Sequence, residues 1–78
     1  MMTNEINSAL VRFANTDLRI ARENGDMSVC QTVDGRIDVN YNRELKSYTL
    51  IGRTKRAENV KAGEARLFLM SVYDVQTT

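Results

Sequence analysis

The sequence predicts a single α+β domain, in which an N-terminal helix, a three-stranded antiparallel meander and a C-terminal helix place both helices on one face of the sheet. Three observations support this. Apolar residues follow helical spacing up to residue 24, polar and apolar residues alternate between residues 27 and 42, and helix formers dominate the last third. With 78 residues, the chain has room for one core, so we expect one domain spanning residues 1–78.

The first element is predicted to be a helix, because its apolar residues recur at steps of three or four. They are Ile6, Leu10, Phe13, Ala14, Leu18 and Ala21. Thr3 or Asn4 is expected to cap its start, and Asn24-Gly25 to end it. However, residues 15–17 are poor helix formers and Asn-Gly also favours a hairpin turn, so Leu18 to Arg22 could instead be a strand. We expect Phe13 to lie in the core.

The middle of the chain is predicted to be the meander. Met27 to Val33 alternates with a period of two, Asp34-Gly35 is typical of a type I′ turn, and Arg36 to Asn42 alternates as a half-exposed strand with Ile37, Val39 and Tyr41 buried. Ser47 to Gly52 is rich in residues suited to a third strand. Cys30 is expected to be a small buried apolar residue.

The last third permits two interpretations. Ala57 to Met70 is rich in helix formers, Thr54 is a suitable cap, and Val60, Leu67 and Phe68 can share a helical face, so we predict a helix. Leu67 to Val75 is also apolar enough for a further strand. Residues 64–75 therefore stay open between helix and strand.

Composition argues against several function classes. The chain has one cysteine and no histidine, which excludes an internal disulfide and every standard zinc site, and leaves Ser or Cys nucleophiles without their commonest base. Asp38, Asn40 and Asn42 imitate a calcium loop, but Arg43 and Thr49 stand where that loop needs glycine and glutamate. We expect no enzymatic activity, no cofactor and no metal.

The compartment and the oligomeric state follow from weaker signals. The longest apolar run is Leu67 to Met70, far short of a membrane span, and a lone cysteine fits a reducing compartment. We therefore expect a cytoplasmic protein. Because so small a core is marginal, a homodimer is a further expectation.

Charge is distributed unevenly along the chain. Residues 43–66 hold seven basic and three acidic residues, a net +4, whereas the remainder holds four basic and seven acidic residues, a net −3. This asymmetry favours an oriented partner. The candidate partner- or phosphate-binding residues are Arg43, Lys46, Arg53, Lys55, Arg56 and Lys61.

The segment Gly52-Arg-Thr-Lys-Arg56 is the sharpest basic feature. If Thr54 caps a helix, Lys55 and Arg56 lie in its first turn and form an anion site with the free N–H groups. With Ala62 and Leu67, this segment resembles the last helix of the double-stranded RNA-binding domain, and the resemblance implies phosphate contacts. It covers only Gly52 to about Leu67: Glu58 replaces an expected alanine, and the family's Gly-Pro-x-His loop is missing.

Together these observations predict a small non-enzymatic binding protein that regulates or inhibits a partner protein by covering part of its surface. In size and class the chain is similar to small phage accessory proteins that block host machinery, including anti-CRISPR proteins. The alternative is a nucleic-acid-binding module that contacts phosphates through Arg53 to Lys61.

Overall fold

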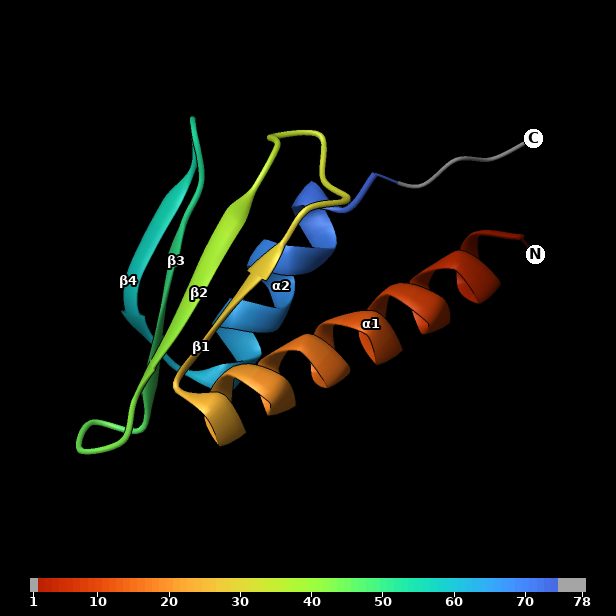
Figure 1. The fold of residues 1–78 in the computed structure, drawn as a ribbon. Helices are drawn as coiled ribbons and strands as arrows, with labels where there is room; N and C mark the ends of the chain where they lie inside the picture. Colours follow the sequence, from red (N-terminus) through yellow and green to blue (C-terminus); the bar gives the residue numbers. More distant parts are fainter. Residues whose placement is uncertain (1, 75–78) are drawn as a thin grey trace.

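The computed structural model describes the backbone of residues 2–74 and the side chains of residues 7–74. Its elements are α1 (Met2–Asn24), β1 (Asp26–Val29), β2 (Ile37–Asn42), β3 (Ser47–Ile51), β4 (Arg56–Val60) and α2 (Ala62–Val72). The strands form an antiparallel sheet in the order β1-β2-β3-β4, and both helices cover the same face (Figure 1). The predicted α+β architecture is confirmed, with one strand more than the three expected.

The core lies between the two helices and the inner face of the sheet. The helices contribute alanines together with leucine and valine side chains, and the strands contribute mainly branched apolar residues. The buried members of the core include Ala14, Leu18, Ala21, Val29, Ile37, Val39, Tyr48, Leu50, Ala65, Leu69 and Val72. Tyr41 is partly buried against this cluster, as the alternation of β2 predicted.

Helix α1 is continuous through Leu18 to Arg22, so the strand alternative for that segment is wrong. It ends as predicted: Gly25 adopts a φ of 92° and its N–H donates to the Ala21 carbonyl at 2.7 Å. The predicted cap is wrong, because the helix already includes Met2 and therefore places Thr3 and Asn4 inside it. The apolar periodicity outweighed the weak helix propensity of residues 15–17.

The connection between β1 and β2 is longer than the predicted two-residue hairpin. Strand β1 ends at Val29, and residues 30–36 form a loop in which Gly35 adopts a φ of 81°. Thr32 pairs with Tyr73 in an isolated antiparallel bridge, so this loop joins the sheet to the end of α2. The Asp34 side chain turns inward rather than outward and is buried.

The predicted helix beginning near Thr54 is wrong, because residues 56–60 are strand β4. Arg53 and Thr54 form a tight turn closed by the Gly52 N–H, which donates to the Lys55 carbonyl at 2.8 Å. Asp34 holds this turn by accepting hydrogen bonds from the backbone N–H and the hydroxyl of Thr54. This tertiary contact overrides the helix propensity of the segment.

Helix α2 begins only at Ala62 and runs to Val72, which settles residues 64–72 as helix; Val75 lies outside the described residues. The fourth strand therefore exists, but upstream of the segment considered for it. Val60, Leu67 and Phe68 do not share a helical face, since Val60 belongs to β4 and Leu67 is 66% exposed.

Candidate functional site

The six predicted basic residues fall into two groups at opposite ends of the sheet. Arg53, Lys55 and Arg56 lie at or beside the β3–β4 turn, and Arg56 pairs with Glu58 at 3.5 Å. Arg43 and Lys46 lie in the β2–β3 turn, where Lys61 joins them through its Nζ, which donates to the Leu45 carbonyl at 2.8 Å. The length of β4 separates the groups, so the six do not form one patch.

The predicted anion site at a helix N-terminus is not formed. Lys55 precedes β4 and Arg56 opens it, so neither lies in the first turn of a helix. Helix α2 starts after Lys61, which takes the N-cap position without a capping side-chain hydrogen bond. The feature on which the likeness to the double-stranded RNA-binding domain depended is a hairpin turn.

A groove of about 560 Å³ opens between α1 and strand β1, on a part of the molecule that the sequence did not single out. Its walls come from one face of the middle of α1, between residues 9 and 17, from β1 and the residues just after it, and from the segment that follows α2. The lining residues are Ala9, Leu10, Phe13, Thr16, Asp17, Met27, Ser28, Val29, Cys30, Gln31, Tyr73 and Asp74.

Phe13 is the main apolar side chain of this groove, and its predicted place in the core is wrong, because it is 58% exposed. The N-terminal part of α1 extends beyond the end of β1 (Figure 1), and Phe13 lines the groove instead of packing under the sheet. The Phe13 ring packs edge-on against Tyr73, with centroids 6.2 Å apart. A signal was present: Phe13 is about 100° from Ala14 around the helix, which places it at the margin of the buried stripe formed by Leu10, Ala14, Leu18 and Ala21.

Tyr73 closes one end of the groove and is fixed there by Asp17. Its hydroxyl donates to Asp17 Oδ2 at 2.5 Å, which ties the end of α2 to the middle of α1. Burial raises the pKa of the Tyr73 phenol well above its ordinary value, and the Asp17 carboxylate raises it further. Tyr73 is therefore a neutral hydrogen-bond donor in the groove wall throughout the physiological pH range.

Cys30 also lines this groove, and the prediction that it is buried is wrong. It follows the last residue of β1, where the chain leaves the sheet, so its side chain is exposed. The chain's single thiol therefore lies in the wall of the groove.

Strand β1 is an edge strand with an open side toward the groove. The Tyr41 N–H donates to the Gly25 carbonyl at 2.9 Å, and in an antiparallel ladder hydrogen-bonded pairs alternate with non-bonded ones. From the observed register, Met27 and Val29 bond to β2, while Asp26 and Ser28 direct their backbone N–H and C=O groups away from the sheet. Among the described residues, these groups have no backbone partner.

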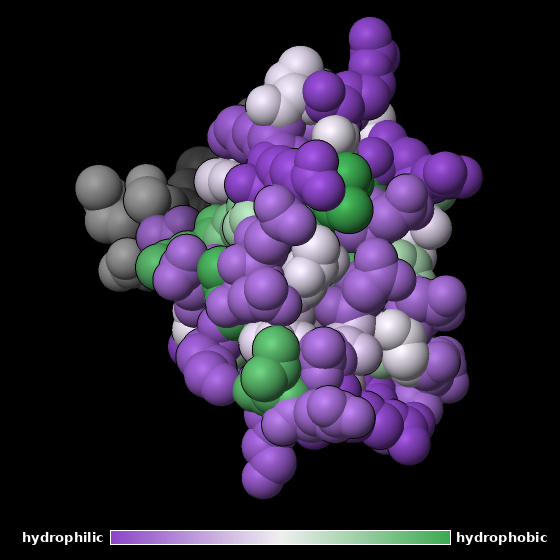
Figure 2. Space-filling model, turned by 90° about the vertical axis from the view of Figure 1, so that its left-hand side faces the viewer, coloured by the Kyte–Doolittle hydropathy of each residue, from purple (hydrophilic) through white to green (hydrophobic). Residues whose placement is uncertain are grey.

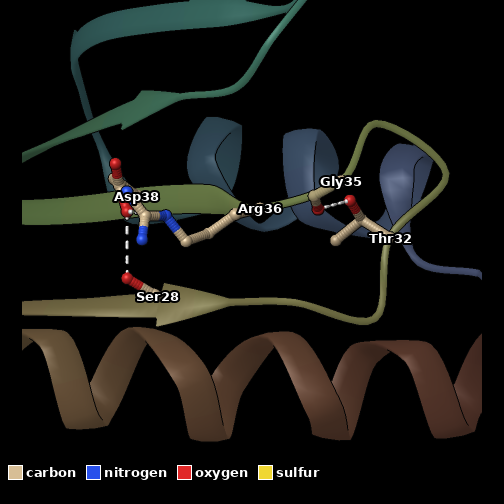
Figure 3. Close-up of polar contacts among 5 residues, drawn as sticks. All are labelled: Ser28, Thr32, Gly35, Arg36 and Asp38. Carbon is tan, nitrogen blue, oxygen red and sulfur yellow. Dashed lines mark hydrogen bonds and ion pairs between the residues drawn. The ribbon is translucent and has the colours of Figure 1, made fainter.

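The outer face of the sheet is polar, and neither α1 nor α2 covers it (Figure 1). Figure 2 shows this face as mostly hydrophilic, with small separate apolar areas. Near β1, the Ser28 hydroxyl donates to Asp38 Oδ1 at 2.9 Å, and Arg36 Nε pairs with the same oxygen at 3.2 Å (Figure 3). Asp26, Met27, Ser28, Asp38 and Asn40 line a shallow hollow of about 250 Å³ there.

Comparison with family models, with curated proteins and with solved structures found no match to the chain. Within residues 2–74, no helix is long and apolar enough to cross a membrane. No group of three or more His, Cys, Asp or Glu side chains in the described part of the chain is placed to hold a metal ion.

Proposed function

We propose that this chain is a non-enzymatic binding protein that regulates or inhibits a partner protein, and that it holds the partner in the groove between α1 and β1. The proposal rests on an open apolar groove directly beside the free side of edge strand β1. Such a groove offers two kinds of contact at once, apolar burial on the helix side and backbone hydrogen bonds on the strand side.

The composition of the groove supports protein binding. Phe13 is large, rigid and more than half exposed, and the neighbouring Tyr73 is held in position by Asp17. Aromatic residues are enriched in protein interfaces, where a few well-packed residues supply most of the binding energy. The absence of histidine from the chain supports a role without acid–base catalysis.

The proposal is tested by attaching a benzophenone maleimide to Cys30, the chain's only thiol, and irradiating the labelled protein in lysate of its native host. We expect one or a few protein adducts. Phe13→Asp should abolish them, whereas Leu67→Asp should not, because Leu67 is exposed to a similar degree but lies outside the groove lining. If the two variants formed equal amounts of crosslinked adduct, the partner would not bind in the groove, which would contradict the proposed function.

Nucleic-acid binding has less support, because its candidate residues lie at both ends of β4. It makes a separate prediction: Arg53, Lys55 and Arg56 together should give salt-sensitive binding to duplex RNA or DNA. Anisotropy titrations at two salt concentrations, with the triple alanine variant as control, test it. Flat curves at low salt would remove this alternative.

A further inference from the structure

Resting on that proposed function, we propose that the groove takes an extended, basic segment of the partner, which adds to the sheet as a further strand beside β1. The inference names the chemistry of the occupant: backbone pairing along the edge, an apolar side chain against Phe13, and Lys or Arg side chains near the carboxylates around the groove.

The backbone geometry provides the pairing. Asp26 and Ser28 present their N–H and C=O groups on the open side of β1, two residues apart, which is the spacing that an added strand matches. Helix α1 stands on the far side of the groove, so an extended chain would lie between a strand and a helix. An added strand alternates its side chains, so every second one would point toward the inner side of the groove, where Phe13 and Met27 lie.

The charge of the surroundings indicates a basic occupant. Asp17 and Asp74 are charged lining residues of the groove, and none of its twelve lining residues is Lys or Arg. On the outer side of the same strand, the shallow hollow adds Asp26 and Asp38. Arg36 offsets Asp38 at 3.2 Å, and Asp26 has no ion-pair partner among the described residues. An extended segment with Lys or Arg would therefore find opposite charge on both sides of β1.

The same charges argue against a second copy of this chain as the occupant. If two β1 strands paired, each would bring its own Asp26 and the carboxylates beside it into one interface. Like charges placed together across paired strands are destabilising. A foreign basic segment carries no such penalty.

The first test is selection of a displayed library of random ten-residue peptides on the immobilised full chain. We expect enriched sequences in which apolar residues alternate with Lys or Arg. A synthetic peptide of the enriched sequence should bind at least about tenfold more tightly than its Lys-to-Glu counterpart, and more weakly as salt rises. Enrichment without basic residues, or equal binding of the two peptides, would overturn the charge argument.

The second test isolates the backbone contact. Ser28→Pro removes one outward N–H, which an edge strand tolerates because the N–H does not serve the ladder to β2. Ser28→Ala removes the same hydroxyl bond to Asp38 but keeps the N–H. With folding verified by circular dichroism, we expect Ser28→Ala to bind the peptide nearly as wild type and Ser28→Pro about tenfold more weakly. Equal affinity of the two variants would overturn strand addition.

The outcomes also separate this inference from the proposed function. If crosslinking through Cys30 depends on Phe13 while Ser28→Pro still captures the partner, the groove binds a partner but not by strand addition. If sedimentation velocity instead shows a dimer that Phe13→Asp dissociates, the occupant is a second copy and the inference is wrong.

Discussion

At the scale of single residues, Asp34 explains why the loop after β1 and the β3–β4 turn stay together. Its carboxylate accepts hydrogen bonds from the backbone N–H of Thr54 at 3.0 Å and from the Thr54 hydroxyl. The hydroxyl bond is the larger cause that holds the pKa of Asp34 below its ordinary value of 3.8. A side chain 20 positions away thus substitutes for the turn residues that a tight hairpin usually needs.

This contact predicts a pH dependence of stability. Because the folded pKa of Asp34 is lowered, its contribution is present above its ordinary value of 3.8 and is lost as pH falls through the folded value. Asp34→Asn should therefore be less stable than wild type near neutral pH, and the difference should shrink below about pH 4. Urea midpoints of both proteins between about pH 6 and 2.5 measure it. A difference that stays constant over that range would show that the charge of Asp34 does not stabilise the turn.

Gly52 is required by the same contact. A Cβ at this position would lie 2.3 Å from Asp34 Oδ2 and 2.4 Å from Ile37 Cδ1. Gly52→Ala should lower the free energy of unfolding by about 1–3 kcal/mol, because Asp34 is held by its hydrogen bonds to Thr54 and Ile37 is completely buried, so neither side chain can move away easily. Gly63→Ala is the control: it meets open space inside α2 and should raise stability by about 0.5–1 kcal/mol. Chemical denaturation measures the free energy of unfolding of both variants, and equal changes in the two would contradict the described packing around Gly52.

At the scale of elements, α2 holds the two layers together through one side of its surface. Leu69 is completely buried between the helix and the sheet, whereas Leu67, two residues earlier, is 66% exposed. Leu69→Ala should cost about 2–5 kcal/mol of unfolding free energy, and the same change at Leu67 less than about 0.5 kcal/mol. Thermal or urea unfolding measures both, and a comparable loss at Leu67 would mean that α2 packs through a different face.

The elements also show where sequence reasoning succeeds. Helix α1 and strand β2 follow from periodicity, because each buries one regular face. Strand β3 follows from its content of residues suited to a pleated sheet. Strand β4 did not follow, since Arg56, Ala57 and Glu58 favour helix and no Asn-Gly or Asp-Gly marks the turn before it. What makes it a strand is pairing with β3 and the contact from Asp34 to Thr54, and both are tertiary.

The groove was hidden from sequence analysis for a related reason. Phe13 carries the helical spacing of a core residue, yet it lies at the margin of the buried stripe of α1, where it lines the groove and is exposed. Similarly, Cys30 follows the alternation of β1 yet lies just beyond its last paired residue. The six candidate basic residues are all exposed, but their distribution over two ends of the sheet depends on the β4 hairpin.

At the scale of the whole molecule, the uncovered faces of the fold differ in character. The outer face of the sheet is largely hydrophilic and suits contact with water (Figure 2). The groove beside β1 instead combines apolar surface with unpaired backbone groups. Edge strands with free backbone groups are usually blocked by charge, twist or a covering segment. The carboxylates around β1 repel strands that carry negative charge, but they allow a segment with Lys or Arg to pair with β1.

Amide hydrogen exchange of the full chain, alone and with the purified partner captured through Cys30, tests the central claim most directly. We predict that the partner slows exchange in residues 26–31 and in residues 9–17 of α1, while the β3–β4 turn at residues 52–55 exchanges as in the free protein. Slower exchange in the β2–β3 and β3–β4 turns, with unchanged exchange rates in β1, would contradict the claim that the partner binds in this groove.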